Sequence, residues 1–298
     1  MHSENPARGA LLLTISALAF AAMGAVIKIV SAELPNEMIV FSRNAMGLIA
    51  LTPWLLRTGR SGVRTPCFRM HLTRALVGLA GMYCFFYAIG HLPLAEAMLL
   101  NYSAPLFIPF IAFLWLGERL PRFFGWAISL GFVGIAMILK PGMILFSPAA
   151  LVGVAAGVLT AVAFVSIRRL ALREPTARIV FYFGTISTVI SAVPLVWSWK
   201  TPAAGLWNLL VGMGILATGG QLLMTRAYAL APAARIGPFS YGTVVFSAAL
   251  GWAIWGEVPD RFSMLGAVLV CTAGVIAVRS MEMTAETIVE KPLAEAIG

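Results

Sequence analysis

The stretch that decides the fold is GMYCFFYAIGHLPLAEAMLLNYSAPLFIPFIAFLWLGE, from Gly81 to Glu118, because the chain contains it twice. Its second version, GQLLMTRAYALAPAARIGPFSYGTVVFSAALGWAIWGE, runs from Gly220 to Glu257. In this one ungapped register seven residue types coincide: Gly81 with Gly220, Pro93 with Pro232, Tyr102 with Tyr241, Gly117 with Gly256, Glu118 with Glu257, Arg122 with Arg261 and Phe123 with Phe262. Apolar composition explains a shared glycine or two, but not two Gly-Glu pairs that close hydrophobic runs of similar length. We infer an internal duplication.

The composition around this repeat is that of an integral membrane protein. Of the 298 residues 60% are hydrophobic and 11% charged, with a mean hydropathy of +0.91, outside the range of soluble domains. The net charge of +9 does not indicate nucleic acid, because the basic residues lie between apolar runs and form no basic, aromatic-interleaved patch. The three cysteines include no CxxC pair and the three histidines have no ligand-like spacing, so neither a disulfide framework nor a metal site is expected.

The hydrophobic runs predict an all-α protein with ten transmembrane helices. A helix needs about 20 apolar residues to cross a bilayer. The ten segments that qualify are 9–30, 36–56, 72–90, 94–115, 121–139, 148–168, 177–197, 206–228, 233–255 and 261–279. Residues 280–298, with four Glu and one Lys, are expected to form a disordered tail.

The loop charges predict how these helices are oriented. If the N-terminus is cytoplasmic, four basic residues fall outside, Arg43 lies within a span, and the other sixteen of the 21 Lys and Arg face the cytoplasm. The four outside are Lys28, Lys140, Lys200 and Arg261. The positive-inside rule therefore places both termini in the cytoplasm. Five spans per copy is an odd number, so the repeat over 148–279 is expected to be inverted relative to the repeat over 9–139.

Inverted repeats are typical of transporters. Their pseudo-two-fold axis lies in the membrane plane, and a site between the repeats can open to either side when the two halves exchange conformations. The duplication therefore favours a carrier that works by alternating access.

Two motifs carry a resemblance to a known family. The predicted fourth and ninth spans end in Leu116-Gly117-Glu118-Arg119 and Trp255-Gly256-Glu257, and each is followed by a glycine-rich span. Over about residues 9–279 the chain resembles the EamA-type members of the drug/metabolite transporter superfamily, and within them the YddG-type aromatic amino acid exporters. The resemblance implies export of amino acids or related metabolites across the bacterial inner membrane. One departure is that Pro105 has no counterpart at Val244, so the two helices need not bend alike.

Polar and aromatic residues within the spans predict a substrate site, since polar groups are costly against lipid and usually face a cavity or another helix. Tyr83 and Tyr87 share one helix face at i and i+4. The other candidates lie in the first, fourth and sixth spans, in the eighth span, which repeats the third, and in the ninth span, which repeats the fourth. The predicted substrate-binding residues are Phe20, Tyr83, Tyr87, Asn101, Tyr102, Phe164, Gln221, Thr225, Ser240 and Tyr241. For Tyr87 and Tyr102 the alternative is a place in the aromatic belt of the membrane interface.

Three charged residues need separate interpretation. Arg43, about seven residues into its span, either pairs with a substrate carboxylate or bonds carbonyls to hold the first repeat together, and the structural role is favoured. Glu118 and Glu257 end hydrophobic runs near water, which indicates an architectural or gating role and not substrate binding.

Absent features narrow the function further. No Asp or Glu lies near the centre of a predicted span, as Glu37 and Glu96 are close to span starts, which disfavours cationic drugs as substrates. HExxH, GxSxG and P-loop motifs are missing, so neither an enzyme nor a cofactor is expected. The leading expectation is a bacterial inner-membrane exporter of aromatic or other hydrophobic amino acids, with membrane lipid and a small-molecule substrate as its partners and no obligate protein partner. The alternatives are export of another neutral metabolite or drug, a channel, or a membrane enzyme.

Overall fold

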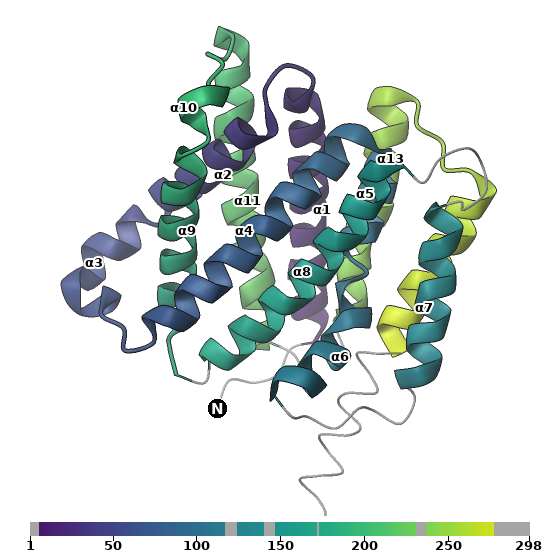
Figure 1. Cartoon of the computed structure of the whole chain (residues 1–298), viewed down its shortest axis with the longest axis horizontal. Coiled ribbons are helices and arrows are strands. Elements are labelled where there is room, and N and C mark those ends of the chain that lie inside the picture. Colours follow the sequence, from purple (N-terminus) through teal and green to yellow (C-terminus); the bar gives the residue numbers. More distant parts are fainter. Residues whose placement is uncertain (1–5, 117–123, 140–146, 172, 231–236, 277–298) are drawn as a thin grey trace, which may run out of the picture.

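The computed structural model of the chain describes residues 6–116, 124–139, 147–171, 173–230 and 237–276, and these contain helices and no strand (Figure 1). The elements are α1 Pro6–Ser31, α2 Asn36–Ala50, α3 Thr52–Val63, α4 Phe68–His91, α5 Leu94–Asn101, α6 Ala104–Leu116, α7 Phe124–Leu139, α8 Pro148–Ala171, α9 Thr176–Ala192, α10 Leu195–Ser198, α11 Ala204–Leu230, the 3-10 helix η1 Gly237–Tyr241 and α13 Gly242–Trp255. A last helix covers Arg261–Ile276. The predicted all-helical class is confirmed for these residues.

Four helices are long and apolar enough to cross a membrane without interruption. They are α1, α4, α8 and α11, through Ala7–Ser31, Phe68–His91, Pro148–Ile167 and Ala204–Met224. Each of the other predicted spans coincides with shorter helices, and several of these are broken in two. The count of ten spans therefore stays a prediction. The tail 280–298 and the Gly117-Glu118 pair lie outside the described residues.

The predicted second span, 36–56, ends earlier than expected. The helix α2 stops at Ala50, and α3 starts at Thr52 with Pro53 in its first turn. Proline lacks an N–H donor and is best tolerated at a helix start, so it begins a new helix here. The expected connection after residue 56 is also partly helical, since α3 continues to Val63, with a break at Gly59 (φ 59°), and α4 begins at Phe68.

The predicted fourth and ninth spans are both interrupted, in different ways. The chain leaves helical geometry between α5 and α6, at Tyr102 and Ser103. Pro105 explains this break, because it cannot donate a hydrogen bond to the carbonyl of Asn101 and its ring disfavours a continuous helix. The ninth span, which has no proline at that position, enters α13 through the 3-10 turn η1.

The two ends of α4 show how the helices run. At its C-terminal end, Lys28 Nζ at the end of α1 donates to the Leu92 carbonyl at 2.8 Å. At its N-terminal end, the Thr65 hydroxyl donates to Glu174, just beyond the end of α8, at 2.5 Å. Thus α1 and α4 run in the same direction and α8 runs against both. We refer to these two ends as the Lys28 end and the Thr65 end.

The opposite directions of α1 and α8 bear on the predicted repeats, because these are their first helices. This geometry favours the inverted arrangement of 9–139 and 148–279, which stays a prediction. The glycine-rich last helices of the two repeats, α7 and Arg261–Ile276, lie together at one edge of the bundle (Figure 1). A Cβ at Gly134 would lie 2.8 Å from the Gly266 carbonyl oxygen, so this close approach requires glycine.

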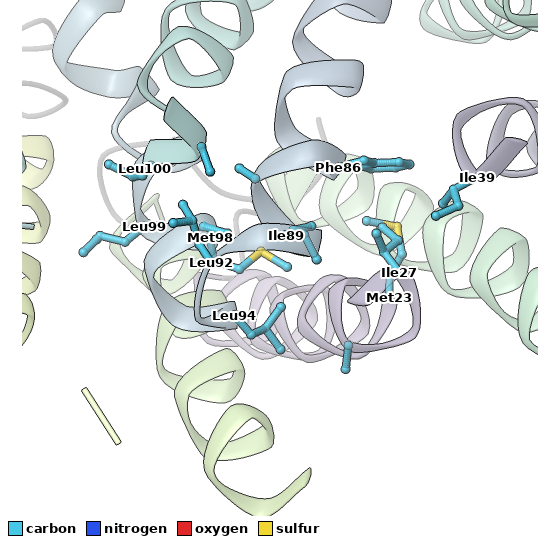
Figure 2. Close-up of a cluster of buried hydrophobic side chains, with 14 of the residues drawn as sticks. Met23, Ile27, Ile39, Phe86, Ile89, Leu92, Leu94, Met98, Leu99 and Leu100 are labelled. Atoms are coloured by element: carbon cyan, nitrogen blue, oxygen red, sulfur yellow. The ribbon is translucent and has the colours of Figure 1, made fainter. Parts of the chain in front are cut away.

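Figure 2 shows the part of the buried apolar core that gathers side chains from α1, α2, α4 and α5. The largest fully buried members include Ile27, Ile39, Ile89, Leu94 and Met98. Between membrane helices, such contacts stabilise mainly through van der Waals packing. Several of them lie within a few residues of Lys28 and Leu92, so the core fills the space between the helices toward the Lys28 end.

Candidate functional site

A central cavity of about 200 Å³ lies among α1, α2, α4, α5, α8 and α9. Its walls are mostly aromatic and methionine side chains, with two arginines and a few neutral polar groups. The lining residues are Phe20, Met23, Arg43, Arg74, Gly78, Gly81, Met82, Phe85, Phe86, Met98, Asn101, Tyr102, Thr160, Ala163, Phe164, Ile167 and Phe183.

Arg74 is the most unusual of these residues. Its side chain is 7% exposed, and its Nε and Nη1 atoms have no hydrogen-bond partner. Its guanidinium carbon lies 4.1 Å from the centre of the Phe183 ring, in a cation–π contact. A Cβ at Gly78, one turn along α4, would collide with Arg74 and approach Phe183 at 3.0 Å, so the glycine leaves room for the guanidinium.

Arg43 adds a second positive charge to the same cavity. Its Nη1 donates to Asn44 Oδ1 at 3.2 Å, and its charge acts on Arg74. In the described part of the chain, no carboxylate forms a salt bridge with either arginine. Burying charge without a counter-ion is costly, and two neighbouring guanidinium groups are well suited to hold a carboxylate. The arrangement can therefore bind an organic anion.

Several of the predicted site residues do lie together. Phe20, Asn101, Tyr102 and Phe164 line the central cavity, as does Arg43. Asn101 Oδ1 accepts a hydrogen bond from the Thr160 hydroxyl at 2.9 Å, and the Tyr102 hydroxyl oxygen accepts one from Thr243 at 3.2 Å. These bonds join the break after α5 to α8 and to α13.

The other predicted residues lie elsewhere. Gln221 lines a second cavity, and the side chain of Thr225 lies outside the described residues. Ser240 and Tyr241 lie in η1 and line neither cavity.

Tyr83 and Tyr87 lie on a different face of α4 from the central cavity. The cavity face follows Arg74, Gly78, Gly81 and Phe85, spaced by three or four residues. The Tyr83 hydroxyl is buried without a partner, and the Tyr87 ring stacks on His91 with 4.0 Å between centroids. Neither tyrosine lines the central cavity, and a substrate-binding role for Tyr83 and Tyr87 stays a prediction.

Arg74 and Phe183 are cavity residues that the sequence argument missed. Arg74 is one of the sixteen basic residues that the positive-inside argument assigns to the cytoplasmic side, since it is only two residues past the predicted start of its span at 72, whereas α4 begins at Phe68 and carries Arg74 in its second turn. The signal that identifies it is the helical spacing from Arg74 to Phe85 through two glycines. For Phe183 no comparable signal exists in the sequence.

A polar cluster around Glu257 joins α1, α5 and the chain after α13 at the Lys28 end. Its carboxylate forms an ion pair with Lys28 and accepts the Leu94 backbone N–H at 2.8 Å. Lys28 also lies 5.2 Å from the Trp255 ring centre. The left-handed conformation of Gly256 (φ 68°) turns the chain after α13 and brings Glu257 back toward α1 and α5. We call the contacts among Lys28, Leu94 and Glu257 the latch.

A second polar cluster lies at the Thr65 end, around the buried carboxylate of Glu174. It accepts hydrogen bonds from Thr65 and from Arg178 Nη1, the latter at 2.6 Å. Arg178 Nε donates in turn to the Gly62 carbonyl at 2.7 Å. Burial acts to raise the pKa of Glu174, but these hydrogen bonds and the charges of Arg178 and His71 outweigh it and hold the pKa below its ordinary value.

We expect Glu174→Gln to destabilise the protein by about 1–3 kcal/mol near neutral pH, the range for hydrogen bonds to charged groups. A carboxylate whose pKa is lowered on folding stabilises the folded state above its ordinary pKa of 4.5, and this stabilisation is lost as the pH falls through the lower folded-state value. In detergent, the melting temperature of the variant should be several degrees lower at pH 7, and the difference should shrink toward pH 4. Glu33→Gln, at an exposed site, is the control. A difference that does not change with pH would contradict this assignment.

Comparisons with known proteins agree with this architecture. The EamA-like transporter family model matches the chain twice, over residues 7–140 and 147–279. The pseudopaline exporter of Pseudomonas aeruginosa (strain UCBPP-PA14) is 37% identical over 275 residues, which cover 91% of this chain and 96% of that protein. A riboflavin transporter of Vibrio cholerae is 27% identical, over 90% and 91% of the two chains.

A more distant relative and a solved structure complete the comparison. An S-adenosylmethionine uptake transporter of Rickettsia bellii is 27% identical over 85% of this chain and 87% of its own. A solved crystal structure has a TM-score of 0.63 at 20% identity, over 92% of this chain and 98% of that chain, and shows the shared fold. The resemblance to EamA-type proteins is confirmed, and transport, not enzymatic catalysis, is the activity that the family and these relatives indicate. From the double match and the identity to the exporter we conclude that this chain, a multi-pass membrane protein, belongs to the EamA-like transporter family.

Proposed function

We propose that this transporter exports a carboxylate-bearing metabolite with an apolar or aromatic body. The observation that carries the proposal is the pair of arginines in the central cavity, of which Arg74 has two buried nitrogen atoms without a partner. A carboxylate entering the cavity would neutralise charge that the protein itself leaves uncompensated. Bidentate bonds from a guanidinium to a carboxylate are among the stronger hydrogen bonds in proteins.

The remaining walls suit the rest of such a molecule. Phe20, Phe85, Phe164 and Tyr102 offer ring faces and edges, while Met23 and Met98 adapt to irregular shapes. Asn101 and Thr160 are the nearby neutral polar groups. A mostly apolar pocket with a few placed polar groups is typical of small-molecule sites.

Aromatic amino acids are the second candidate, favoured by the same aromatic walls. Their carboxylate fits the arginines, but their ammonium group would meet two positive charges, and among the described residues that line the cavity there is no carboxylate to offset the repulsion. We therefore place an acid without an ammonium group first. The named relatives carry different cargoes and include an uptake transporter, so kinship alone does not choose among substrates.

The proposed mechanism is alternating access between two inverted repeats, 9–139 and 148–279, in the bacterial inner membrane with both termini cytoplasmic. The antiparallel course of α1 and α8 supports the inversion, and the loop charges support the orientation. In this mechanism the latch closes the Lys28 end, and substrate enters from the Thr65 end, which the positive-inside rule predicts to be cytoplasmic. The 37% identity to an exporter supports this direction.

Three compounds that share a phenyl-ethyl body test the proposal: 3-phenylpropionate, phenylalanine and phenethylamine. They carry a carboxylate, a carboxylate with an ammonium, and an ammonium alone. In counterflow assays with proteoliposomes we expect 3-phenylpropionate to be carried best, phenylalanine less well and phenethylamine not at all. Preference for phenylalanine would favour the amino acid alternative, and transport of phenethylamine at equal rates would overturn both.

A further inference from the structure

A second cavity of about 320 Å³ lies beside the central one, between α2, α9 and α11. Its walls include Gly47, Gly184, Thr218 and Gln221. Arg43 and Phe183 line both cavities and so form the partition between them. A group held by Arg43 can therefore extend to either side of this partition.

We propose that this second cavity is a specificity chamber: it receives the apolar part of an acid that is too large for the central cavity, while the carboxylate stays at the arginines. This inference rests on the proposed function, because it requires the anionic group to be bound at Arg43. It assigns the chamber to the substrate itself and predicts that acids with large apolar bodies depend on it.

The glycines of the chamber support this assignment. A Cβ at Gly47 would have Thr218 Oγ1 as its nearest neighbour at 3.8 Å, and one at Gly184 would have Leu48 at 3.7 Å. Both are ordinary contacts, so close helix packing does not require glycine at either position. The contrast is Gly157 on α8, where a Cβ would lie 2.6 Å from the Leu100 carbonyl oxygen. Glycine inside a helix is destabilising relative to alanine, and here its effect is to leave the chamber empty.

The size of the chamber fits a sizeable apolar group. An apolar cavity of about 150 Å³ holds a benzene-sized molecule. The central cavity thus has room for about one ring, and the second cavity has room for a larger body.

The walls of the chamber are also more polar than expected for a surface that contacts only lipid acyl chains. Its walls carry Asn44, Thr218 and Gln221 in addition to Arg43. Polar side chains are costly against acyl chains and usually mark a substrate path or a helix contact. The exposed Leu222 lies at its rim, so a lipid chain is the competing occupant that the experiment has to separate.

Filling the chamber provides the test, with Gly184→Leu on α9 and Gly47→Leu on α2 as independent variants. The matched control is Gly212→Leu on α11, since Gly212 lines neither cavity and has open space around it. Counterflow is measured for a one-ring acid, 3-phenylpropionate, and a two-ring acid, 3-(4-biphenylyl)propionate. We expect both chamber variants to reduce transport of the two-ring acid at least tenfold and of the one-ring acid less than threefold. The control should change neither.

The outcomes separate this inference from the proposed function. If wild-type protein carries the one-ring acid in an Arg74-dependent manner but chamber variants affect both acids equally, or neither, the chamber assignment is wrong and the proposed function stands. If the wild type carries neither acid, the proposed function fails. Native mass spectrometry tests whether a lipid chain occupies the chamber instead. If both leucine variants lose a bound lipid while transport is unchanged, the inference is overturned. If a leucine variant fails to fold, the alanine variants Gly184→Ala and Gly47→Ala replace it. They should reduce transport of the two-ring acid in the same direction but by a smaller factor.

Discussion

Replacing Arg74 with Gln should reduce transport of a carboxylate substrate at least a hundredfold without weakening the fold. The loss corresponds to about 2.7 kcal/mol, the size expected when charge-assisted bonds to a carboxylate are removed. Arg74→Lys should recover only part of the activity, because an ammonium group keeps the charge but not the planar, bidentate geometry. The measurements are counterflow in proteoliposomes and the melting temperature in detergent.

The melting temperature distinguishes a substrate-binding arginine from a structural one. The Arg74 guanidinium has two nitrogens without a partner and lies near the charge of Arg43, so its removal should leave the melting temperature unchanged or raise it. Arg178 provides the contrast, since it is paired with the buried Glu174, and Arg178→Gln should lower the melting temperature. If Arg74→Gln lowers stability as much as Arg178→Gln while transport is retained, Arg74 is structural and the anion site is wrong. Counterflow and melting temperature of Arg43→Gln decide in the same way between the two roles of Arg43, which are pairing with a substrate carboxylate and holding the first repeat together.

Breaking the latch should open the Lys28 end of the transporter. In Glu257→Gln the ion pair to Lys28 is lost, and the Leu94 N–H keeps at most a neutral acceptor. Side chains of the pair are 13% and 22% exposed, so the interaction is partly shielded from water. We expect the balance between the two access states to shift about tenfold, which corresponds to about 1.4 kcal/mol. Labelling of a cysteine at Thr160, in a protein without Cys67, Cys84 and Cys271, by a membrane-impermeant maleimide applied from the Lys28 side measures this shift.

A charge exchange tests whether the ion pair itself is responsible. The double variant Lys28→Glu with Glu257→Lys restores the ion pair. It restores neither the bond from the Leu94 N–H, because lysine has no acceptor, nor the bond to the Leu92 carbonyl, because glutamate has no donor. Labelling in the double variant should fall part of the way back toward wild type, and each single variant should label faster than the double. Equal labelling of wild type and Glu257→Gln would show that the latch does not control access.

In the proposed mechanism, substrate binding and closure of one side belong to two separate groups of residues, the arginines and the latch. In that proposal the substrate binds at Arg43, in the middle of α2, and at Arg74, in the second turn of α4, while contacts at the ends of α1 and α13 close one side. Tyr102 connects these regions, since it lines the cavity and its hydroxyl is bonded to Thr243 on α13. A bound substrate that moves Tyr102 can therefore act on the helix that carries Glu257.

The sequence alone determined the features of this protein that depend on local physics. Membrane character, the helical class and the approximate positions of the spans follow from the apolar runs, because about 20 consecutive apolar residues have few alternatives to a helix in a bilayer. The breaks near Pro53 and Pro105 follow from the missing N–H of proline. The repeated Gly-Glu motif was sufficient to recognise the family, and it also singled out Glu257, the acceptor in the latch.

Only the tertiary structure decided which side chains meet. The cavity face of α4 carries Arg74 and not Tyr83, and the helix is apolar on most sides, so no polar stripe in the sequence marks that face. Each step of one residue turns a side chain by about 100°, so the two steps from Gly81 to Tyr83 reach the opposite side of α4, and the packing of the helix decides which side faces the cavity. The latch joins Lys28 to a residue 229 positions away, and the anion site joins α2 to α4. Such contacts depend on how whole helices pack, and packing between apolar helices is set by shape, which no local pattern encodes.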